Sequence, residues 1–145
     1  MRVLVTGGAG FIGANLSKRL TSGLVPVVSE VVVLDNLSTG FAANLEGVDV
    51  DFIEGSFLDP DALERVGRVD SIVHLGARPS VPRSIDDPVA SHMANASGTV
   101  AVLELARSCD AHVVVASSSS VYGATATLPK SEDLATRPMS PYAAS

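Results

Sequence analysis

Cysteine is nearly absent from this sequence of 145 residues, and its scarcity excludes two kinds of site. Cys109 is the only cysteine, so the chain can form neither an internal disulfide nor a cysteine-based metal cluster. Cys109 follows an apolar helical stretch, which favours a small buried side chain over a reactive thiol. His92 and His112 have no partner pattern, so we predict no metal site. A reducing compartment suits this composition, and we expect the cytoplasm.

Basic residues and long apolar runs are also scarce. Ten Lys and Arg residues against sixteen Asp and Glu residues give a net charge of −6, and no basic cluster occurs. Such a chain repels a polynucleotide, so we exclude nucleic acid as a partner. No apolar run approaches the ~20 residues of a membrane helix, and we expect no membrane association. Apolar residues nevertheless make up 46% of the chain, which indicates one globular domain over residues 1–145.

Short runs rich in Val, Ile and Leu predict the strands. Four continuous runs, at residues 3–6, 31–34, 71–74 and 112–116, suit parallel strands that are buried on both faces. A weaker alternating segment at residues 48–53 supplies a fifth strand.

Helical patterns separate these runs. Residues 11–21 place four apolar side chains at helical spacing, with Lys18 and Arg19 outside: Phe11, Ile12, Leu16 and Leu20. A cap and proline at 59–60 open a second helix, and Asp87 and Pro88 open the longest one, which we expect to reach about Ser108. Residues 124–141 indicate a long loop, after which a new helix begins. The alternation predicts an α/β fold, a Rossmann-type doubly wound parallel sheet.

A glycine-rich loop joins the first strand to the first helix. Gly7, Gly10 and Gly13 are spaced one residue wider than the glycines of the usual dinucleotide fingerprint, but they have the same physical roles. They allow a tight turn, close approach of a pyrophosphate, and a helix N-terminus that faces the anion. Asp35 ends the second strand, where a carboxylate would bind ribose hydroxyls and repel a 2′-phosphate. These features predict NAD rather than NADP as the cofactor.

The sequence resembles the extended short-chain dehydrogenase/reductase family, in particular its NAD-dependent epimerase/dehydratases. The resemblance covers the whole chain. It rests on TGGAGFIG (6–13), DNLSTG (35–40), HLGARPSVPRSIDDP (74–88), NASGT (95–99), SSSSVYG (117–123) and SPYAAS (140–145). Residues 128–133 and 138–142 are similar to epimerases of UDP-glucose and UDP-N-acetylglucosamine. The resemblance therefore implies epimerisation of a nucleotide sugar at C4 through a transient 4-keto intermediate.

The resemblance also implies roles for individual residues. The cofactor-binding set is Gly7, Gly10, Phe11, Ile12 and Gly13 at the pyrophosphate, Asp35 and Asn36 at the ribose, and Leu75, Gly76, Ala77 and Asn95 near the inner half. Ser118 and Tyr142 match the catalytic serine or threonine and the catalytic tyrosine. Ser84, Ser119 and Ser120 are the expected substrate contacts.

The adenine pocket departs from the family pattern. The family has Gly-Asp-Ile or Gly-Asp-Leu after the third strand, whereas this chain has Gly55, Ser56 and Phe57. Ser56 offers a hydrogen bond without a charge, so we expect Ser56 and Phe57 to form a rearranged adenine pocket.

The tyrosine motif of the family continues with a lysine at the position directly after Ser145, and a substrate domain follows it. The chain ends at Ser145, so we expect a Rossmann domain truncated before that substrate domain. A protein limited to these residues should lack activity, and the intact protein should form the homodimer of the family.

Several residues also have structural interpretations. Ser118 could stabilise loop backbone, and His74 is better explained as a hydrogen-bonded structural histidine than as a base. Arg78 and Arg83 could be solvated charges or phosphate contacts.

Two other functions remain open. A sugar-nucleotide 4,6-dehydratase would carry Asp-Glu where this chain has Ser119 and Ser120. A non-catalytic dinucleotide sensor would not need both Ser118 and Tyr142, and a lysine at position 146 would argue against it.

Overall fold

A computed structural model describes residues 1–145, which form two compact units. The first unit comprises residues 1–76 and 98–116, and the second comprises residues 77–97 and 117–145. Each unit is described separately below.

The first unit contains a five-stranded sheet in which all paired strands are parallel, in the order β3-β2-β1-β4-β5. The strands are β1 (Arg2–Thr6), β2 (Glu30–Asp35), β3 (Asp51–Glu54), β4 (Ser71–His74) and β5 (His112–Val115). This is the Rossmann-like parallel sheet that the sequence predicts. The strand order reverses between β1 and β4, and in such sheets ligands bind outside the carboxyl ends of the strands at this switch point.

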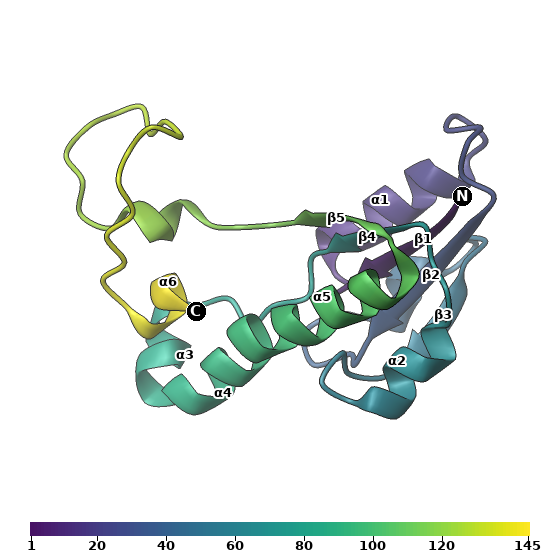
Figure 1. Ribbon diagram of the computed structural model, residues 1–145, viewed down its shortest axis with the longest axis horizontal. Helices are drawn as coiled ribbons and strands as arrows, with labels where there is room; N and C mark the ends of the chain where they lie inside the picture. Colours follow the sequence, from purple (N-terminus) through teal and green to yellow (C-terminus); the bar gives the residue numbers. More distant parts are fainter. The chain divides into compact units, whose positions relative to one another are not determined.

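Helices cover both faces of this sheet. The first unit contains α1 (Phe11–Thr21), the 3-10 turn η1 (Ala42–Leu45), α2 (Pro60–Val66) and α5 (Gly98–Cys109). Figure 1 shows α1 on one face of the sheet and α2 and α5 on the other. The doubly wound arrangement follows from this placement.

Alternating side chains of the strands build a separate apolar cluster on each face. Val3 and Val5 of β1 pack with Ala14 of α1, whereas Leu4 of the same strand packs with Ala62 of α2 and Val102 of α5. Burial of β1 on both sides therefore explains its continuous apolar run.

Two expectations about burial are wrong. Phe11 and Ile12 do not join the buried face of α1, since they are 84% and 66% exposed. The buried positions of α1 are Gly13, Ala14 and Ser17, whose small side chains let the helix lie close to the sheet. The strand β5 is the edge of the sheet, and most of its side chains are exposed rather than buried on both faces.

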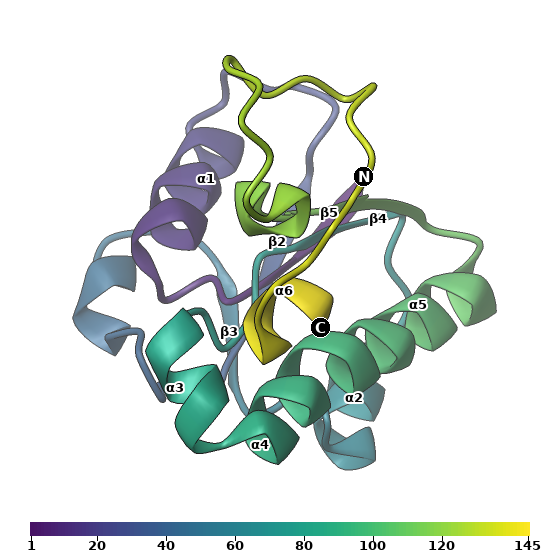
Figure 2. The ribbon, with the colours of Figure 1, turned by 90° about the vertical axis from the view of Figure 1, so that its left-hand side faces the viewer.

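The second unit consists of short helices and one long loop. Its helical segments are α3 (Val81–Asp86), α4 (Pro88–His92), the π-helix η2 (Met93–Ser97), the 3-10 turn η3 (Ser119–Tyr122) and α6 (Pro141–Ala144). The helices α3, α4 and α6 contact one another, as both views show (Figures 1 and 2). Residues 124–140 contain no helix or strand, as expected.

Side-chain caps begin three of these helices. The side chains of Ser80, Asp87 and Ser140 each accept a hydrogen bond from a backbone N–H of the first helical turn. The helix expected from Asp87 to about Ser108 is correct at its start but is interrupted by η2. The helix α3 is not among the expected elements. No helix in the structure is long and apolar enough to span a membrane.

Candidate cofactor site and catalytic residues

The glycine loop between β1 and α1 is closed by contacts that only glycine permits. Gly7 has φ +67°, and its N–H donates to the carbonyl of Leu34 at 2.9 Å. A Cβ on Gly13 would lie 2.4 Å from the carbonyl oxygen of Gly7, and one on Gly8 would lie 2.5 Å from Val33 Cγ1. The requirement for glycine at these three positions therefore comes from the fold itself. Gly8 is a position that the spacing of the motif does not single out.

Gly10 has a different environment. A Cβ on Gly10 would meet only the Gly7 carbonyl oxygen, at 3.2 Å. Gly10 is the N-cap of α1 and gives the helix no side-chain hydrogen bond, so the first N–H groups of the helix lack both a helical acceptor and a side-chain cap. Phe11 and Ile12 are exposed beside these groups. An exposed helix N-terminus with a bare N-cap fits the pyrophosphate of a dinucleotide.

Asp35, at the end of β2, is bonded to the glycine loop. Its Oδ2 accepts the N–H of Ala9 at 2.9 Å, and its Oδ1 accepts the N–H of Leu37 at 2.8 Å. The carboxylate is buried, and its oxygens retain further lone pairs that suit a ribose hydroxyl. Asn36 is exposed next to it, and its Oδ1 accepts the N–H of Ser38. The ribose contacts of Asp35 and Asn36 stay predictions.

Ala9 links this loop to the segment that follows β2. Its carbonyl oxygen accepts the N–H of Phe41 at 3.1 Å and the side-chain amide of Asn44 at 2.8 Å. Sequence reasoning missed these bonds because they are made by backbone atoms of an alanine. The DNLSTG motif was a partial signal, since Gly40 packs directly on Ala9.

The carboxyl end of β4 lies against the glycine loop. A Cβ on Gly7 would lie 2.8 Å from the backbone nitrogen of Gly76, so the two backbones are in contact. The N–H of Leu75 donates to the Thr6 carbonyl, and the N–H of Gly76 donates to Thr6 Oγ1, both at 3.2 Å. The predicted residues Gly7, Leu75 and Gly76 therefore meet at the switch point of the sheet.

Ser56 and Phe57, which follow β3, make different kinds of contact. The hydroxyl of Ser56 accepts the N–H of Leu58 at 3.1 Å. The ring of Phe57 packs between the backbones of Gly76 and Gly98, where a Cβ would lie 2.5 Å and 2.2 Å from ring atoms. This contact gives Phe57 a packing role, and an adenine contact for either residue stays a prediction.

His74 ends β4 and is almost fully buried. Its Nδ1 lies 2.6 Å from Thr6 Oγ1, and its Nε2 lies 3.2 Å from Thr99 Oγ1. The ring meets Phe57 edge to face, with centroids 5.2 Å apart. Burial lowers the pKa of His74 and favours the neutral ring. His74 is thus hydrogen-bonded and structural, as its position at the end of an apolar strand indicates.

Asn95 is the buried polar residue of the π segment in the second unit. Its Oδ1 accepts the N–H of Arg78 at 2.7 Å, and its Nδ2 donates to Ser145 Oγ at 3.0 Å. Ala77, beside Arg78, is exposed. Single π turns within helices are frequent at functional sites. Asn95 links the residues after β4 to the last residue of the chain.

Ser118 and Tyr142 lie on contacting elements of the second unit. Ser118 is the N-cap of η3, and its Oγ accepts the N–H of Ser120 at 3.2 Å. Tyr142 lies in α6, which contacts η3, and is half-buried. Ser119 is exposed and Ser120 is half-buried. The structure thus shows Ser118 stabilising loop backbone, and a catalytic role for Ser118 or Tyr142 stays a prediction.

Ser84 is fully buried, and its hydroxyl donates to the Val81 carbonyl at 2.7 Å. This geometry supports a packing role, and the substrate contact of Ser84 stays a prediction. The guanidinium of Arg78 lies 3.6 Å from a carboxylate oxygen of Asp87, so this arginine is paired within its own unit.

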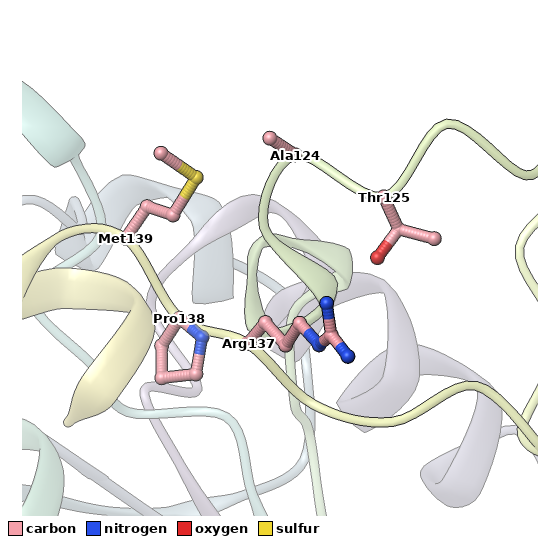
Figure 3. Close-up of a pocket in the computed structure, with 5 residues that line it drawn as sticks. All are labelled: Ala124, Thr125, Arg137, Pro138 and Met139. Carbon is pink, nitrogen blue, oxygen red and sulfur yellow. The ribbon is translucent and has the colours of Figure 1, made fainter.

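An open pocket of about 370 Å³ lies in the long loop of the second unit (Figure 3). It is lined by Ala124, Thr125, Arg137, Pro138 and Met139. The N–H of Arg137 donates to the Val121 carbonyl at 2.8 Å, which ties the loop to η3. None of the predicted site residues lines this pocket.

Comparison with known proteins identifies the family of the chain. The sequence profile described as the NAD dependent epimerase/dehydratase family matches residues 3–145. Among curated relatives, a UDP-glucose 4-epimerase of Mycolicibacterium smegmatis is 41% identical over 152 residues, which cover 99% of this chain and 47% of the relative. The chain spans about half the length of the curated relatives it matches.

Solved structures give the same fold. DesIV, a dTDP-glucose 4,6-dehydratase from Streptomyces venezuelae with NAD bound, is 40% identical with a TM-score of 0.90. The UDP-glucose 4-epimerase of Thermus thermophilus in complex with NAD is 37% identical with a TM-score of 0.85. Each match covers 99% of this chain, and they cover 48% and 47% of the two solved chains.

Proposed function

Because the chain belongs to the NAD-dependent epimerase/dehydratase family, we propose that the intact protein binds NAD and epimerises a nucleotide sugar at C4. A UDP-sugar is the proposed substrate, since the 41% identical relative is a UDP-glucose 4-epimerase. The observation that carries the proposal is the arrangement of Gly7, Gly10, Asp35 and Gly76 around the switch point of the sheet. It combines a bare helix N-terminus, a buried carboxylate and a backbone contact between the segments that follow β1 and β4.

NAD is the proposed cofactor because the carboxylate of Asp35 would repel the 2′-phosphate that distinguishes NADP from NAD. The segment after Asp35 contains no arginine or lysine until Arg65, so no nearby cation in the sequence offsets that carboxylate. Calorimetric titration of the intact protein should show tighter binding of NAD than of NADP. Equal or tighter binding of NADP would contradict this assignment.

The proposed chemistry gives Tyr142 and Ser118 separate tasks. Tyr142 takes the proton from the C4 hydroxyl of the sugar, and Ser118 hydrogen-bonds the C4 oxygen as it becomes a carbonyl. When bound, NAD supplies the hydride acceptor for C4 and the source of the returning hydride. The 4-keto sugar then receives a proton back from Tyr142 after presenting its other face. No net oxidation results.

A 4,6-dehydratase is the second candidate, because DesIV is 40% identical to this chain. Dehydration needs an additional acid and base, which the dehydratases place as Asp-Glu directly after the catalytic position. This chain has Ser119 and Ser120 there, and a serine hydroxyl is a poor acid or base at neutral pH. This difference favours epimerisation.

Product analysis separates the two reactions. The intact protein should convert UDP-glucose or UDP-N-acetylglucosamine into its C4 epimer, which NMR identifies from the coupling constants of the sugar ring. A stable 4-keto-6-deoxy sugar would support the dehydratase instead. Tyr142→Phe should abolish turnover while NAD still binds.

We also propose a homodimer for the intact protein. Two apolar side chains one turn apart in α5, Val100 and Leu103, are 60% and 43% exposed. Such a stripe on a helix is typical of a surface that packs against another helix. Sedimentation velocity should give the mass of a dimer for the wild type and of a monomer for V100E/L103E.

A further inference from the structure

His74 is a buried titratable residue that the proposed chemistry does not use. It is 3% exposed, and it joins three elements of the first unit. Thr6 at the end of β1 lies on one side of the imidazole, and Thr99 at the start of α5 lies on the other. Gly76, two residues after His74, is bonded to the same Thr6 hydroxyl. We call Gly76, Thr6, His74 and Thr99 the His74 network.

The hydrogen bond from Gly76 has a fixed direction, whereas the directions of the two bonds at His74 depend on which ring nitrogen carries the proton. The N–H of Gly76 can only donate, so Thr6 Oγ1 accepts it at 3.2 Å. The hydroxyl proton of Thr6 is then available for His74 Nδ1, which lies 2.6 Å away. If Nδ1 accepts, the neutral ring carries its proton on Nε2 and donates it to Thr99 Oγ1 at 3.2 Å. Each group then donates to the next, from Gly76 through Thr6 and His74 to Thr99.

Packing holds the imidazole in this orientation. Phe57 meets the ring edge to face at an interplanar angle of 85°. The same phenyl ring fills the space between Gly76 and Gly98, where neither residue has room for a Cβ. A displaced His74 would therefore have to move Phe57 away from Gly76.

Gly76 is the point at which this network reaches the candidate cofactor site. Its backbone nitrogen contacts Gly7, the first residue of the glycine loop. The Thr6 hydroxyl therefore contacts both the end of β4, through Gly76, and the imidazole of His74. We infer that His74 is a positioning residue, which acts through Thr6 to hold Gly76 against the glycine loop in the geometry that binds the dinucleotide. The inference rests on the proposed function for the identity of the ligand.

Two amide substitutions separate this role from simple core packing. In His74→Asn the side-chain oxygen lies near the position of Nδ1 and can accept from Thr6, whereas in His74→Gln the amide lies near the position of Nε2 and can reach only Thr99. Measured by calorimetry on the intact protein, His74→Gln should raise the Kd for NAD about tenfold, the usual effect of one lost hydrogen bond. His74→Asn should raise it by less than about threefold.

Threonine variants test the other end of the same bond. Thr6→Val removes the hydroxyl without changing the shape of the side chain and should also weaken NAD about tenfold, whereas Thr6→Ser should restore binding. Thr6→Val combined with His74→Gln should be no worse than either variant alone, because both break one network. Thr21→Val is the matched control, since the Thr21 hydroxyl donates to the backbone carbonyl of Ser17 within α1, and it should leave the Kd unchanged.

The readouts distinguish failure of this inference from failure of the proposed function. A wild type that does not bind NAD would overturn both. If the wild type binds NAD, but His74→Asn and His74→Gln raise the Kd equally or the effects on the Kd add in the double variant, only the role of His74 is overturned.

Nitrogen-15 NMR of the imidazole gives an independent check that does not require NAD. A proton on Nε2 supports the network, and a proton on Nδ1 overturns it. Circular dichroism of each variant confirms that it is folded.

Discussion

Asp35 lies between two backbone N–H groups, those of Ala9 and Leu37, so its carboxylate holds the glycine loop in addition to the ribose contact proposed for it. Removing it should therefore do more than relax the choice between NAD and NADP. Hydrogen bonds to a charged group are worth about 1.5–3 kcal/mol each, and a loosened loop presents its N–H groups less well to either cofactor.

The expected result for Asp35→Ala is weaker binding of both dinucleotides, with a larger loss for NAD, so that the preference for NAD narrows. Calorimetric titration of both cofactors measures this. Glu46→Ala is the control, because Glu46 is an exposed carboxylate after η1. Unchanged NADP affinity in Asp35→Ala would show that the contact with Ala9 does not support the loop.

Ser17 gives a prediction about stability. Its hydroxyl is buried in α1 and has no hydrogen-bond partner. Leaving a buried polar group unpaired costs about 1–3 kcal/mol, so Ser17→Ala should raise the free energy of unfolding by ~1 kcal/mol. Ser91→Ala is the matched control, because the equally buried Ser91 hydroxyl donates to the Asp87 carbonyl at 3.1 Å. Urea denaturation should show the two substitutions acting in opposite directions.

His74 gives a prediction about pH. Burial lowers its pKa in the folded protein below the ordinary value of about 6.5, and its contacts Thr6, Thr99 and Phe57 carry no charge. As the pH falls below that ordinary value, the unfolded chain takes up the proton before the folded one does. Stability therefore decreases through that window and levels off below the folded pKa.

The measurement is the unfolding free energy of wild type and His74→Asn at a series of pH values from about 7 to 5. The variant has no titratable group at this position, so its stability should fall less steeply. Parallel curves for the two proteins would show that His74 makes no contribution to the pH dependence.

At the scale of elements, two glycines of the loop between β1 and α1 have different roles. The fold requires a glycine at Gly13, whereas at Gly10 the proposed ligand requires it. Gly13→Ala would bring a Cβ to 2.4 Å from the Gly7 carbonyl and should destabilise the protein by ~2 kcal/mol or more. Gly10→Ala meets one atom at 3.2 Å and should cost ~1 kcal/mol at most. If a pyrophosphate lies over Gly10, the alanine should nevertheless weaken NAD strongly. Thermal unfolding and NAD titration together check this, and Gly10→Ala with unchanged affinity would contradict the placement.

Much of the fold follows from the sequence because buried parallel strands have a simple signature. The expected strand at residues 71–74 matches β4 in full, and the ranges expected for the other strands overlap β1, β2, β3 and β5. The helix α3 is not predicted although Ser80 and Pro82 signal a helix start, because the segment that follows is only six residues long. The π segment was missed because the sequence keeps a helical pattern through it.

The candidate site was predictable at a coarser level. Glycines and Asp35 stand out by spacing, since the backbone must turn and a carboxylate must end β2. The carbonyl of Ala9 and the hydroxyl of Thr6 do not, because their roles depend on distances across the sheet. Side-chain exposure was also hidden, so Phe11 and Ile12 were assigned to a buried face that smaller residues occupy.

At the scale of the whole molecule, the chain carries the residues proposed to bind the cofactor, together with Ser118 and Tyr142, which are proposed to act on the sugar, while it spans about half the length of its curated relatives. For the intact protein, we propose that hydrogen leaves C4 of a nucleotide sugar as hydride and returns to the same carbon on the opposite face. A label placed at C4 should therefore stay on that carbon.

The direct test uses UDP-glucose carrying deuterium at C4, incubated with the intact protein and NAD, with the product followed by NMR and mass spectrometry. We expect the C4 epimer with the deuterium still on C4, and no net formation of NADH. Deuterium on C6 of a 4-keto-6-deoxy product, loss of the label to solvent, or the absence of a C4 epimer would contradict it.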